Sequence, residues 1–213
     1  MYSYKNIPRC VEYTFQEQLL AQLLNRQSYD TWDDKLPGLP RGSRTERDKL
    51  KDKIKADLKL IQRGYCAYCG IRFMVRGGES HIHREHILAK NTERYRKFTF
   101  EPLNLALACS RCNGFDVKGT KDYVVYYNDL YPLISVSIIH PHLDNIESHL
   151  TSDNSVFVEP IDNSPKGIKT IIEFQLNEEA MLYLRGTYIK AKNIPVSDDD
   201  EELIDEIINR EYM

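Results

Sequence analysis

The chain has 213 residues, of which 41% are hydrophobic, with a single Trp and a formal net charge of −3. This composition fits a soluble globular protein, and the absence of any window of 18 apolar residues excludes a membrane span. The opening MYSYKNIPRC lacks the apolar region of a signal peptide, so we expect a cytoplasmic protein with no membrane partner.

The charge is unevenly distributed along the chain. Residues 41–121 hold 19 Lys and Arg against 9 Asp and Glu, a balance of +10, while the other 132 residues carry −13. A basic segment of this kind is what contacts with nucleic-acid phosphates require. The overall charge of −3 therefore does not exclude a nucleic-acid enzyme.

Two helices are predicted before the first cysteine pair. Residues 11–27 have apolar side chains at helical spacing, and residues 28–43 form a break rich in Pro and Gly. Residues 44–63 form the second helix, with Leu50, Ile54, Leu58 and Ile61 on one side. The Lys and Arg residues on its other sides fit a solvated face and a nucleic-acid contact equally well. We divide the chain into an N-terminal helical region (1–43), a core with the cysteine pairs (44–130) and a C-terminal region (131–213).

Four cysteines form two Cys-x-x-Cys pairs, Cys66 with Cys69 and Cys109 with Cys112. Each pair brings two thiolates together, and two pairs supply the four sulfurs of a tetrahedral structural Zn²⁺ site. The alternative is two unrelated redox or buried pairs. Such a closed site is scaffold, so any chemistry must lie in the 39 residues between the pairs. Cys10 is left as an odd thiol, which fits a reducing compartment.

The insert between the cysteine pairs predicts two strands. One strand covers residues 79–88 and ends near His86, and a second covers residues 103–109. Neighbouring strand residues point to opposite faces, so Glu85 and His86 can serve one site only where the strand ends or bends. Ser110 is a reasonable N-cap for a short helix that carries Asn113.

This ordered set resembles the HNH endonucleases, the ββα-metal nucleases, in their zinc-stapled form. The residues that carry the resemblance are Cys66-x-x-Cys69, Glu85-His86-Ile87, Asn104-Leu105 and Cys109-x-x-Cys112-Asn113, with Lys118 beyond. The expected fold class is α+β, with a ββα-metal motif embedded in a mainly helical domain and a small C-terminal β segment.

The resemblance implies a role for each matching position. His86 would be the general base, and Asn104 would hold its imidazole in place. Glu85 and Asn113 would bind a catalytic Mg²⁺ or Mn²⁺ ion. A neutral histidine accepts a proton at pH 7, and a hard cation with few oxygen ligands keeps positions open for phosphate. Both asparagines also fit ordinary turn and cap residues.

Further residues are candidates for contact with the substrate. The basic loop of residues 91–97 carries Arg94, Arg96 and Lys97, and Lys118 follows the second cysteine pair. We assign these four cations to nucleic-acid phosphate. His81 and His83 share a strand face, either as accessory groups or merely exposed. Four tyrosines could stack on unpaired bases, although packing is the simpler interpretation: Tyr123, Tyr126, Tyr127 and Tyr131.

The C-terminal region predicts strands and then helices. The runs LISVSII, SVFVEP and IKTIIEF between residues 133 and 176 read as strands, and residues 143–150 as a short helix. Asn177 is expected to cap a helix over residues 178–192. The acidic run 198–202 opens a last amphipathic helix.

The C-terminal region adds a second resemblance. It carries, in order, Pro-x-Leu-Asp from Pro141, His149, Val158-Glu159-Pro160, Gly167 to Ile171, Leu176-Asn177 and Arg185. This order is similar to that in small HNH proteins of bacterial anti-phage systems, the Septu type and related retron-associated effectors, which work beside an ATPase. It implies a defence nuclease with an ATPase partner, and we expect DNA rather than RNA as the substrate. The alternative is a catalytically silent, zinc-stabilised module that binds nucleic acid or protein.

Overall fold

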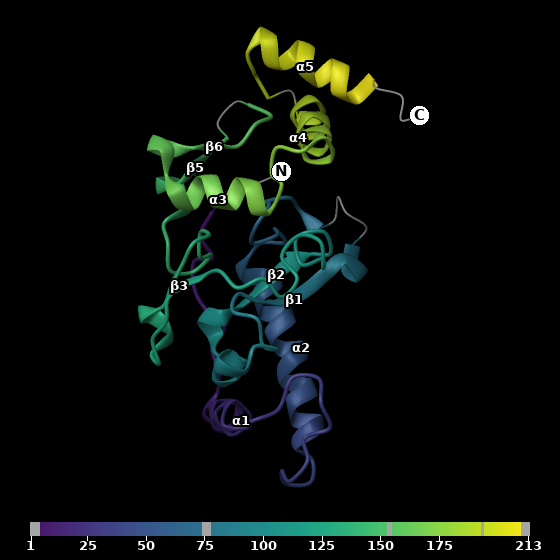
Figure 1. Cartoon of the computed structure of the whole chain (residues 1–213). Coiled ribbons are helices and arrows are strands. Elements are labelled where there is room, and N and C mark those ends of the chain that lie inside the picture. Colours follow the sequence, from purple (N-terminus) through teal and green to yellow (C-terminus); the bar gives the residue numbers. More distant parts are fainter. Residues whose placement is uncertain (1–4, 74–77, 153–154, 193, 210–213) are drawn as a thin grey trace.

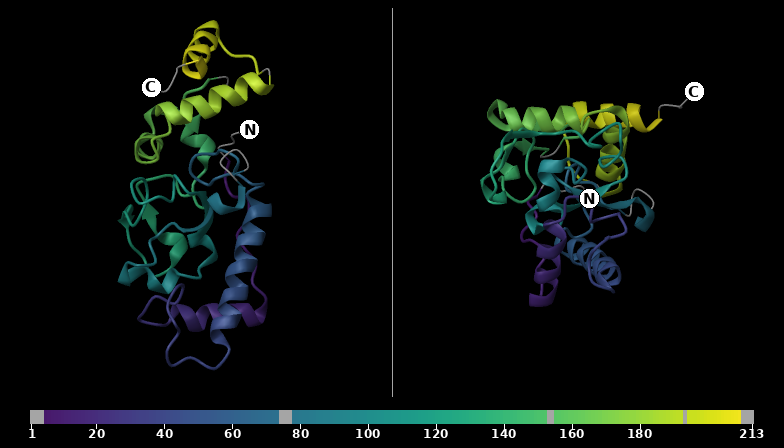
Figure 2. Two further views of the ribbon diagram at one scale, coloured as in Figure 1. Left: turned by 90° about the vertical axis from the view of Figure 1, so that its right-hand side faces the viewer. Right: turned by 60° about the horizontal axis from the view of Figure 1, so that its bottom comes forward.

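The computed structural model describes residues 5–73, 78–152, 155–192 and 194–209. The molecule is elongated, with helix α1 (Phe15–Asn25) at one end and helices α4 (Glu179–Lys192) and α5 (Asp198–Asn209) at the other (Figures 1 and 2). Over the described ranges, α-helices combine with three separate two-stranded sheets. The predicted α+β class is confirmed.

Helix α1 is shorter than the predicted range 11–27 because it has a defined start. The Thr14 side chain accepts a hydrogen bond from the Glu17 amide, and the Glu17 carboxylate accepts one from the Thr14 amide. This reciprocal capping box fixes the first turn. Ala21 and Leu24 are buried, but Phe15 remains 71% exposed, so only part of the predicted apolar face packs.

Helix α2 (Ser43–Ile61) follows the prediction closely. Its four predicted core residues, Leu50, Ile54, Leu58 and Ile61, are all buried. Arg47, expected on the solvated face, is buried as well, and its guanidinium donates to the carbonyl oxygen of Asp34 at 2.6 Å. One of the predicted surface cations therefore anchors the break that precedes the helix.

Strands β1 (Ile82–His86) and β2 (Leu105–Cys109) pair antiparallel at the centre of the molecule (Figure 1). Ile82 lies opposite Cys109, and His86 lies opposite Leu105. All of β2 is buried. It begins at Leu105 rather than at residue 103 because Pro102–Asn104 forms a 3₁₀ turn, η4. Both strands of the insert are confirmed, and β1 ends at His86 as predicted. It begins at Ile82 rather than at residue 79 because Gly78–His81 forms a 3₁₀ turn, η2.

The short helix predicted after Ser110 is wrong, because residues 110–120 form a series of turns. Gly119 has a φ of +49°, and a Cβ atom there would lie 2.8 Å from the carbonyl oxygen of Phe115. The backbone is folded too tightly for a regular helix at this point. The basic loop at 91–97 also differs from the prediction, since most of it lies in a 3₁₀ helix, η3 (Glu93–Phe98).

The C-terminal β signals are only partly realised. Strand β3 (Val124–Tyr126) pairs with β4 (Ser135–Val136), and β5 (Leu150–Thr151) pairs with β6 (Glu159–Pro160). The runs LISVSII and SVFVEP thus contribute two strand residues each. The short helix expected over residues 143–150 is a single 3₁₀ turn, η6 (Ile146–Ser148).

The run IKTIIEF lies in helix α3 (Pro165–Glu173), so its prediction as a strand is wrong. The Ser164 side chain accepts a hydrogen bond from the Gly167 amide at 3.1 Å, and Pro165 occupies the first helical position. A serine cap followed by proline is a strong helix start, and it overrides the β propensity of the isoleucines.

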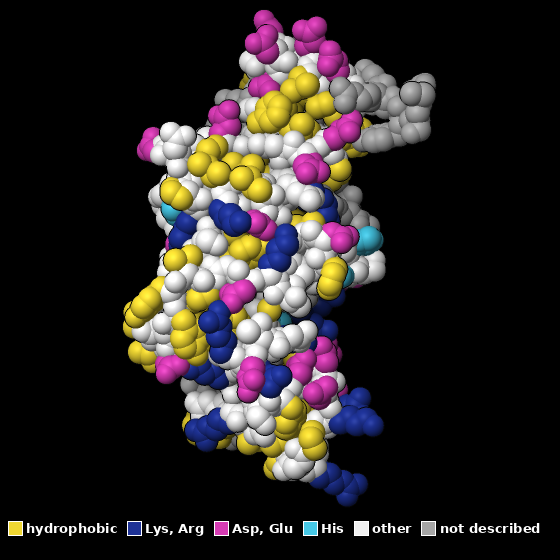
Figure 3. All heavy atoms as spheres, in the orientation of Figure 1, with side chains coloured by type: hydrophobic (Ala, Val, Ile, Leu, Met, Phe, Trp, Pro, Cys, Tyr) yellow, Lys and Arg dark blue, Asp and Glu magenta, His cyan; other side chains and the backbone are white. Residues whose placement is uncertain are grey.

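The two last helices are confirmed, but their surroundings differ from expectation. Asn177 does not cap α4 with its side chain, which instead exchanges two 2.8 Å hydrogen bonds with the backbone of Val158. Ile204 of α5 packs with Ile189 of α4 and with Val156 in a small separate core. The apolar side of α5 is therefore already covered, and acidic side chains gather on the end of the molecule that α5 forms (Figure 3).

The main hydrophobic core runs from Val11 to Met181 and crosses both boundaries that we predicted, near residues 43 and 130. The β1–β2 pair and helix α2 contribute its central members. In the part of the chain that the structure describes, no helix is both long and apolar enough to cross a membrane.

Candidate metal centre and polar cavity

The four paired cysteines converge on one buried point. The sulfurs of Cys66, Cys69, Cys109 and Cys112 all lie within 4.8 Å of one another, and none forms a disulfide. The Sγ atoms of Cys69 and Cys109 are 3.8 Å apart. Tetrahedral zinc with Zn–S bonds of roughly 2.3 Å separates its sulfurs by about 3.8 Å. This thiol cluster could therefore hold a zinc ion, as the spacing of the cysteines predicted.

Backbone turns place the thiols. The Gly70 amide donates to the Cys66 carbonyl at 3.1 Å, with Gly70 at a φ of +65°, and the Asn113 amide donates to the Cys109 carbonyl at 3.0 Å. The Cys109 amide also donates to the Cys66 sulfur at 3.3 Å. Burial raises the pKa of the Cys66 thiol well above its usual value. Zinc would need these thiols as thiolates, so its binding would release protons.

A cavity of about 140 Å³ opens beside the end of β1. Three of the four predicted catalytic residues, Glu85, His86 and Asn113, line it together with Lys118. The remaining lining residues are Arg84, Ala89, Lys90, Asn91, Gly119 and Thr120. Glu85 and His86 share the cavity because the strand ends there, and the turn after Cys112 carries Asn113 and Lys118 to the same place.

His86 is buried and held in a defined orientation. Its Nε2 atom lies 3.1 Å from the carbonyl oxygen of Thr99, and its ring meets the Trp32 ring edge-on at 4.4 Å. A carbonyl only accepts, so Nε2 carries the proton and Nδ1 holds the lone pair. Burial lowers the pKa of His86 to about 3, and the imidazole is neutral at pH 7.

Asn104 makes its contacts with the loop around His86 rather than with the imidazole. Its Oδ1 atom accepts from the Leu88 amide at 2.7 Å and from the Tyr131 hydroxyl at 2.9 Å. Its Nδ2 atom donates to the carbonyl oxygens of Leu88 and Phe98. The Thr99 carbonyl, which adjoins Phe98, takes the hydrogen bond of His86. Asn104, predicted to hold the imidazole in place, therefore reaches it only through this loop.

Glu85 forms a buried ion pair with Lys118 at the cavity. Lys118 is 1% exposed, and its Nζ atom lies 2.6 Å from Glu85 Oε1 and 3.0 Å from the His86 carbonyl oxygen. The Tyr68 hydroxyl donates to the same Oε1 atom at 3.1 Å. Burial raises the pKa of Glu85, and the ammonium of Lys118 opposes that rise. Lys118, predicted to contact nucleic-acid phosphate, is thus a buried residue that lines the cavity and pairs with Glu85.

Asn113 contacts His83, one of the two further histidines of the insert. Its Nδ2 atom lies 3.1 Å from His83 Nδ1, and Ser110 Oγ lies 2.9 Å from His81 Nδ1. The predicted common strand face is wrong, because His81 ends the 3₁₀ turn η2 (Gly78–His81) and only His83 lies in β1. Both side chains contact the turn that holds the second cysteine pair. With Nδ2 engaged by His83, the Oδ1 atom of Asn113 is the one suited to bind a cation.

The predicted phosphate contacts of η3 lie outside the cavity lining. Arg94 pairs with Asp122, and Lys97 pairs with Asp129. Arg96 donates to the Ser28 carbonyl oxygen. Arg94 and Lys97 are on the surface, but each already has an acidic partner.

Two contributors escaped the sequence analysis. Tyr68 has no predicted role, although its position between Cys66 and Cys69 was a usable signal. Trp32 lies in a loop far along the chain from His86, and no spacing rule connects the two.

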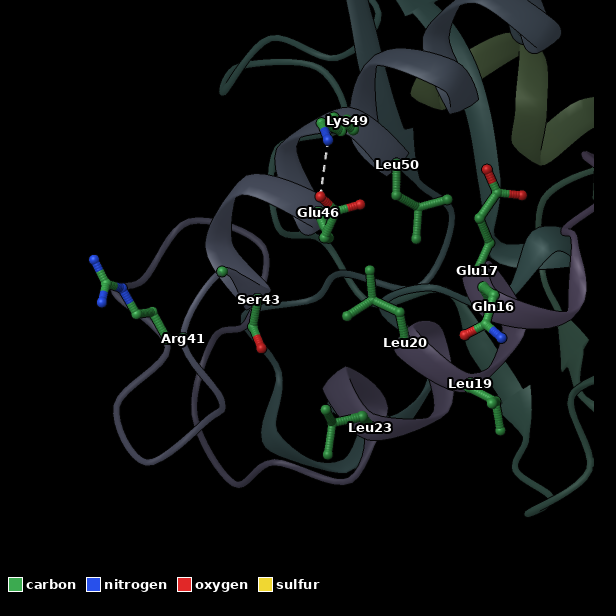
Figure 4. Close-up of a pocket in the computed structure, with 11 residues that line it drawn as sticks. Gln16, Glu17, Leu19, Leu20, Leu23, Arg41, Ser43, Glu46, Lys49 and Leu50 are labelled. Atoms are coloured by element: carbon green, nitrogen blue, oxygen red, sulfur yellow. Dashed lines mark hydrogen bonds and ion pairs between the residues drawn. The ribbon is translucent and has the colours of Figure 1, made fainter.

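A larger groove of about 750 Å³ separates α1 from α2 (Figure 4). Leu20, Leu23 and Leu50 line it, and its charged residues include Glu46 and Lys49, which pair at 2.8 Å. It contains no histidine, cysteine or aspartate. The smaller cavity, with a neutral imidazole beside a carboxylate, a carboxamide and an ammonium, is therefore the better candidate for chemistry. The chain matches no protein-family model and no curated protein.

Proposed function

We propose that the chain is a metal-dependent endonuclease of the HNH type that hydrolyses phosphodiester bonds in nucleic acid. The observation that carries the proposal is the cavity shared by Glu85, His86 and Asn113 at the end of β1. These are three positions at which the motif of the HNH endonucleases places catalytic residues, and they come from two segments 27 residues apart in the sequence.

His86 is the general base of this proposal. Its Nε2–H is engaged by the Thr99 carbonyl, which leaves Nδ1 to take a proton from the attacking water. The imidazole is neutral at pH 7, so it has a lone pair to offer, but a pKa of about 3 makes it a weak base. General-base catalysis is most effective when the pKa of the base lies near the operating pH. General-base catalysis of this kind contributes roughly a hundred- to ten-thousand-fold in rate.

Glu85 and Asn113 are the residues that would hold a catalytic Mg²⁺ or Mn²⁺ ion. The donor set offers a carboxylate and a carboxamide oxygen from one cavity and no thiolate, as a hard cation prefers. The cation would share the Glu85 carboxylate with the ammonium of Lys118. When bound, the cation would neutralise charge on the scissile phosphate and the leaving oxygen. Zn²⁺ at the thiol cluster is structural in this scheme, since four thiolates leave no open position.

The biological setting follows from the resemblance to anti-phage HNH proteins. We propose a defence nuclease that acts on DNA beside an ATPase partner. Because the apolar side of α5 packs on α4, the acidic side of α5 is the surface available for such a partner. Reversing the exposed charges of Asp199 and Glu202 should weaken complex formation without unfolding the protein, as measured by co-purification.

The nuclease is tested by incubating the protein with plasmid DNA and Mg²⁺ or Mn²⁺, with the ATPase added where the isolated protein is inert. His86→Gln should lower the cleavage rate by about 100-fold or more. His142→Gln is the matched control, because His142 also bonds a backbone carbonyl, that of Leu105 at 2.9 Å, and does not line the cavity. A His86→Gln variant as active as the wild type would refute the assignment.

A silent binding module is the second candidate, and one observation favours it. The carboxylate of Glu85 is already neutralised by Lys118. That module would bind nucleic acid or protein and would leave DNA uncut with either cation, in the presence of the partner as well as alone.

A further inference from the structure

The hydrogen bonds of Glu85 connect the polar cavity to the thiol cluster. Tyr68 lies between Cys66 and Cys69 in the first cysteine pair, and Lys118 lies six residues after Cys112. Both side chains meet the same oxygen of Glu85, at 3.1 Å and 2.6 Å. Each half of the cluster thus supplies one partner to the carboxylate.

Both partners are themselves fixed. The Tyr68 ring stacks on Phe174 with centroids 4.1 Å apart and planes 13° from parallel. The backbone amide of Lys118 donates to the Cys112 carbonyl at 3.3 Å, and its ammonium also bonds the His86 carbonyl at 3.0 Å. Neither group is free to follow the carboxylate if it moves.

A carboxylate has about four acceptor sites on its two oxygens. The contacts from Tyr68 and Lys118 both fall on Oε1, and the His86 backbone amide is a further partner of the carboxylate. These three contacts leave acceptor capacity on the carboxylate for a ligand of the cavity. Partners that orient a metal ligand typically change metal affinity by about 10- to 100-fold when they are removed.

We propose that Tyr68 and Lys118 are positioning residues that fix Glu85 for a divalent cation, and that the thiol cluster sets the position of the catalytic carboxylate through them. This inference rests on the proposed nuclease function. It extends that function by giving the thiol cluster a part in cation binding, beyond its contribution to folding.

Mn²⁺ binding tests the proposal without reference to cleavage. Trp32 is the only Trp of the chain, and its ring contacts His86, which lines the cavity. Quenching of its fluorescence by paramagnetic Mn²⁺ therefore reports occupancy of this site, and electron paramagnetic resonance of free Mn²⁺ gives the affinity independently.

Tyr68→Phe removes only the hydroxyl and keeps the ring on Phe174. It should weaken Mn²⁺ binding by about tenfold and lower kcat while KM for DNA stays within twofold. Tyr123→Phe is the matched control, because the Tyr123 hydroxyl donates to the Glu173 carboxylate at the same 3.1 Å outside the cavity lining. It should change neither quantity.

Lys118→Met distinguishes an ammonium that orients Glu85 from one that competes with the cation for its site. A positioning ammonium predicts weaker Mn²⁺ binding in the variant, whereas an ammonium that occupies the place of the cation predicts tighter binding. Lys121→Met, which removes the same charge from an exposed Lys paired with Glu173, is the control. The zinc content and the melting temperature of every variant establish that it is folded.

Unchanged or tighter Mn²⁺ binding in Tyr68→Phe or Lys118→Met overturns the proposal, as does a wild-type protein that binds no Mn²⁺ near Trp32. Failure of the nuclease function looks different. In that case the wild type binds Mn²⁺, both variants bind it more weakly, and no form of the protein cuts DNA with or without the partner.

Discussion

The thiol cluster and the polar cavity use the two ends of one strand pair for opposite purposes. Cys109 lies opposite Ile82, and His86 lies four residues further along β1, roughly 13 Å away at the usual rise per residue. The cluster surrounds one point with four identical, buried ligands. The cavity presents four chemically different side chains and stays open to solvent on one side.

In the thiol cluster, four thiolates would fill the coordination sphere of a metal ion. The cavity has room for another molecule. A tetrahedral thiolate site has no coordination position to spare, so its free energy goes into folding. The cavity holds a neutral imidazole, a carboxylate, a carboxamide and an ammonium, which in the proposed nuclease would act on a bound substrate. The two regions should therefore respond differently to substitution, the first in stability and the second in activity.

The largest effect is expected from the closed site. Cys69→Ser removes one of four thiolates and should abolish stoichiometric zinc binding, with a loss on the order of 10 kcal/mol from the folding of residues 65–120. Zinc content by mass spectrometry and thermal unfolding by circular dichroism measure both. Cys10→Ser is the control, because Cys10 lies outside the cluster and its nearest polar contact is His142 at 3.8 Å. A Cys69→Ser protein that melts like the wild type would show that the cluster does not stabilise the fold.

Substitution of Asn104 tests whether this residue contributes to stability or to activity. Its fully buried side chain forms hydrogen bonds with the Leu88 amide and with two carbonyl groups. Asn104→Ala leaves these buried groups without a partner and should lower the free energy of unfolding by about 3 kcal/mol. Asn128→Ala, which removes an exposed contact to the Leu130 amide, should cost less than about 1 kcal/mol. Both are measured by urea unfolding. Lost cleavage with unchanged stability in Asn104→Ala would instead restore the predicted catalytic role.

Local patterns were enough to predict much of the closed region. The spacing of Leu50, Ile54, Leu58 and Ile61 matches the buried face of α2, and the strand pair appears where short apolar runs flank the cysteines. Helix α3 could also have been recognised, since Ser164 and Pro165 are helix-start residues. The β propensity of the isoleucines outweighed that signal in the prediction.

The open region depends on contacts that sequence spacing does not contain. Lys118 reads as one more cation in a basic segment, yet it is buried against Glu85, 33 residues away in the chain. The orientation of His86 depends on its hydrogen bond to the Thr99 carbonyl and on the contact of its ring with the Trp32 ring. These partners meet only after β1 and β2 have paired, and so local propensity cannot predict them.

Acid should weaken the fold through histidines that are buried and neutral. Burial lowers the pKa of His86 and of His140 to about 3, below the value of about 6.5 in an unfolded chain. Between these values the unfolded chain binds more protons, so the free energy of unfolding falls as pH decreases. For each histidine the slope approaches about 1.4 kcal/mol per pH unit.

Urea unfolding between pH 7 and pH 5 checks this expectation. Thiolate protonation adds its own pH dependence at the cluster, so the comparison is with His140→Gln, which retains the cluster and His86. Its slope should be shallower than that of the wild type by the contribution of one histidine. Equal slopes would mean that His140 takes up a proton as readily in the folded protein as in the unfolded chain.

The smallest effect is expected from substitutions on the surface, outside the thiol cluster and the polar cavity. Arg94 is 49% exposed and paired with Asp122, a kind of surface ion pair that contributes little to stability. If Arg94 contacts phosphate, Arg94→Ala should reduce the slope of log affinity against log salt by about one, in DNA-binding measurements over a range of salt concentrations. Asp122→Asn should strengthen binding, because it removes the competing carboxylate. Lys190→Ala breaks a comparable pair with Asp205 at the far end of the molecule and should leave the slope unchanged (Figure 1). Equal slopes for Arg94→Ala and Lys190→Ala would exclude Arg94 as a phosphate contact.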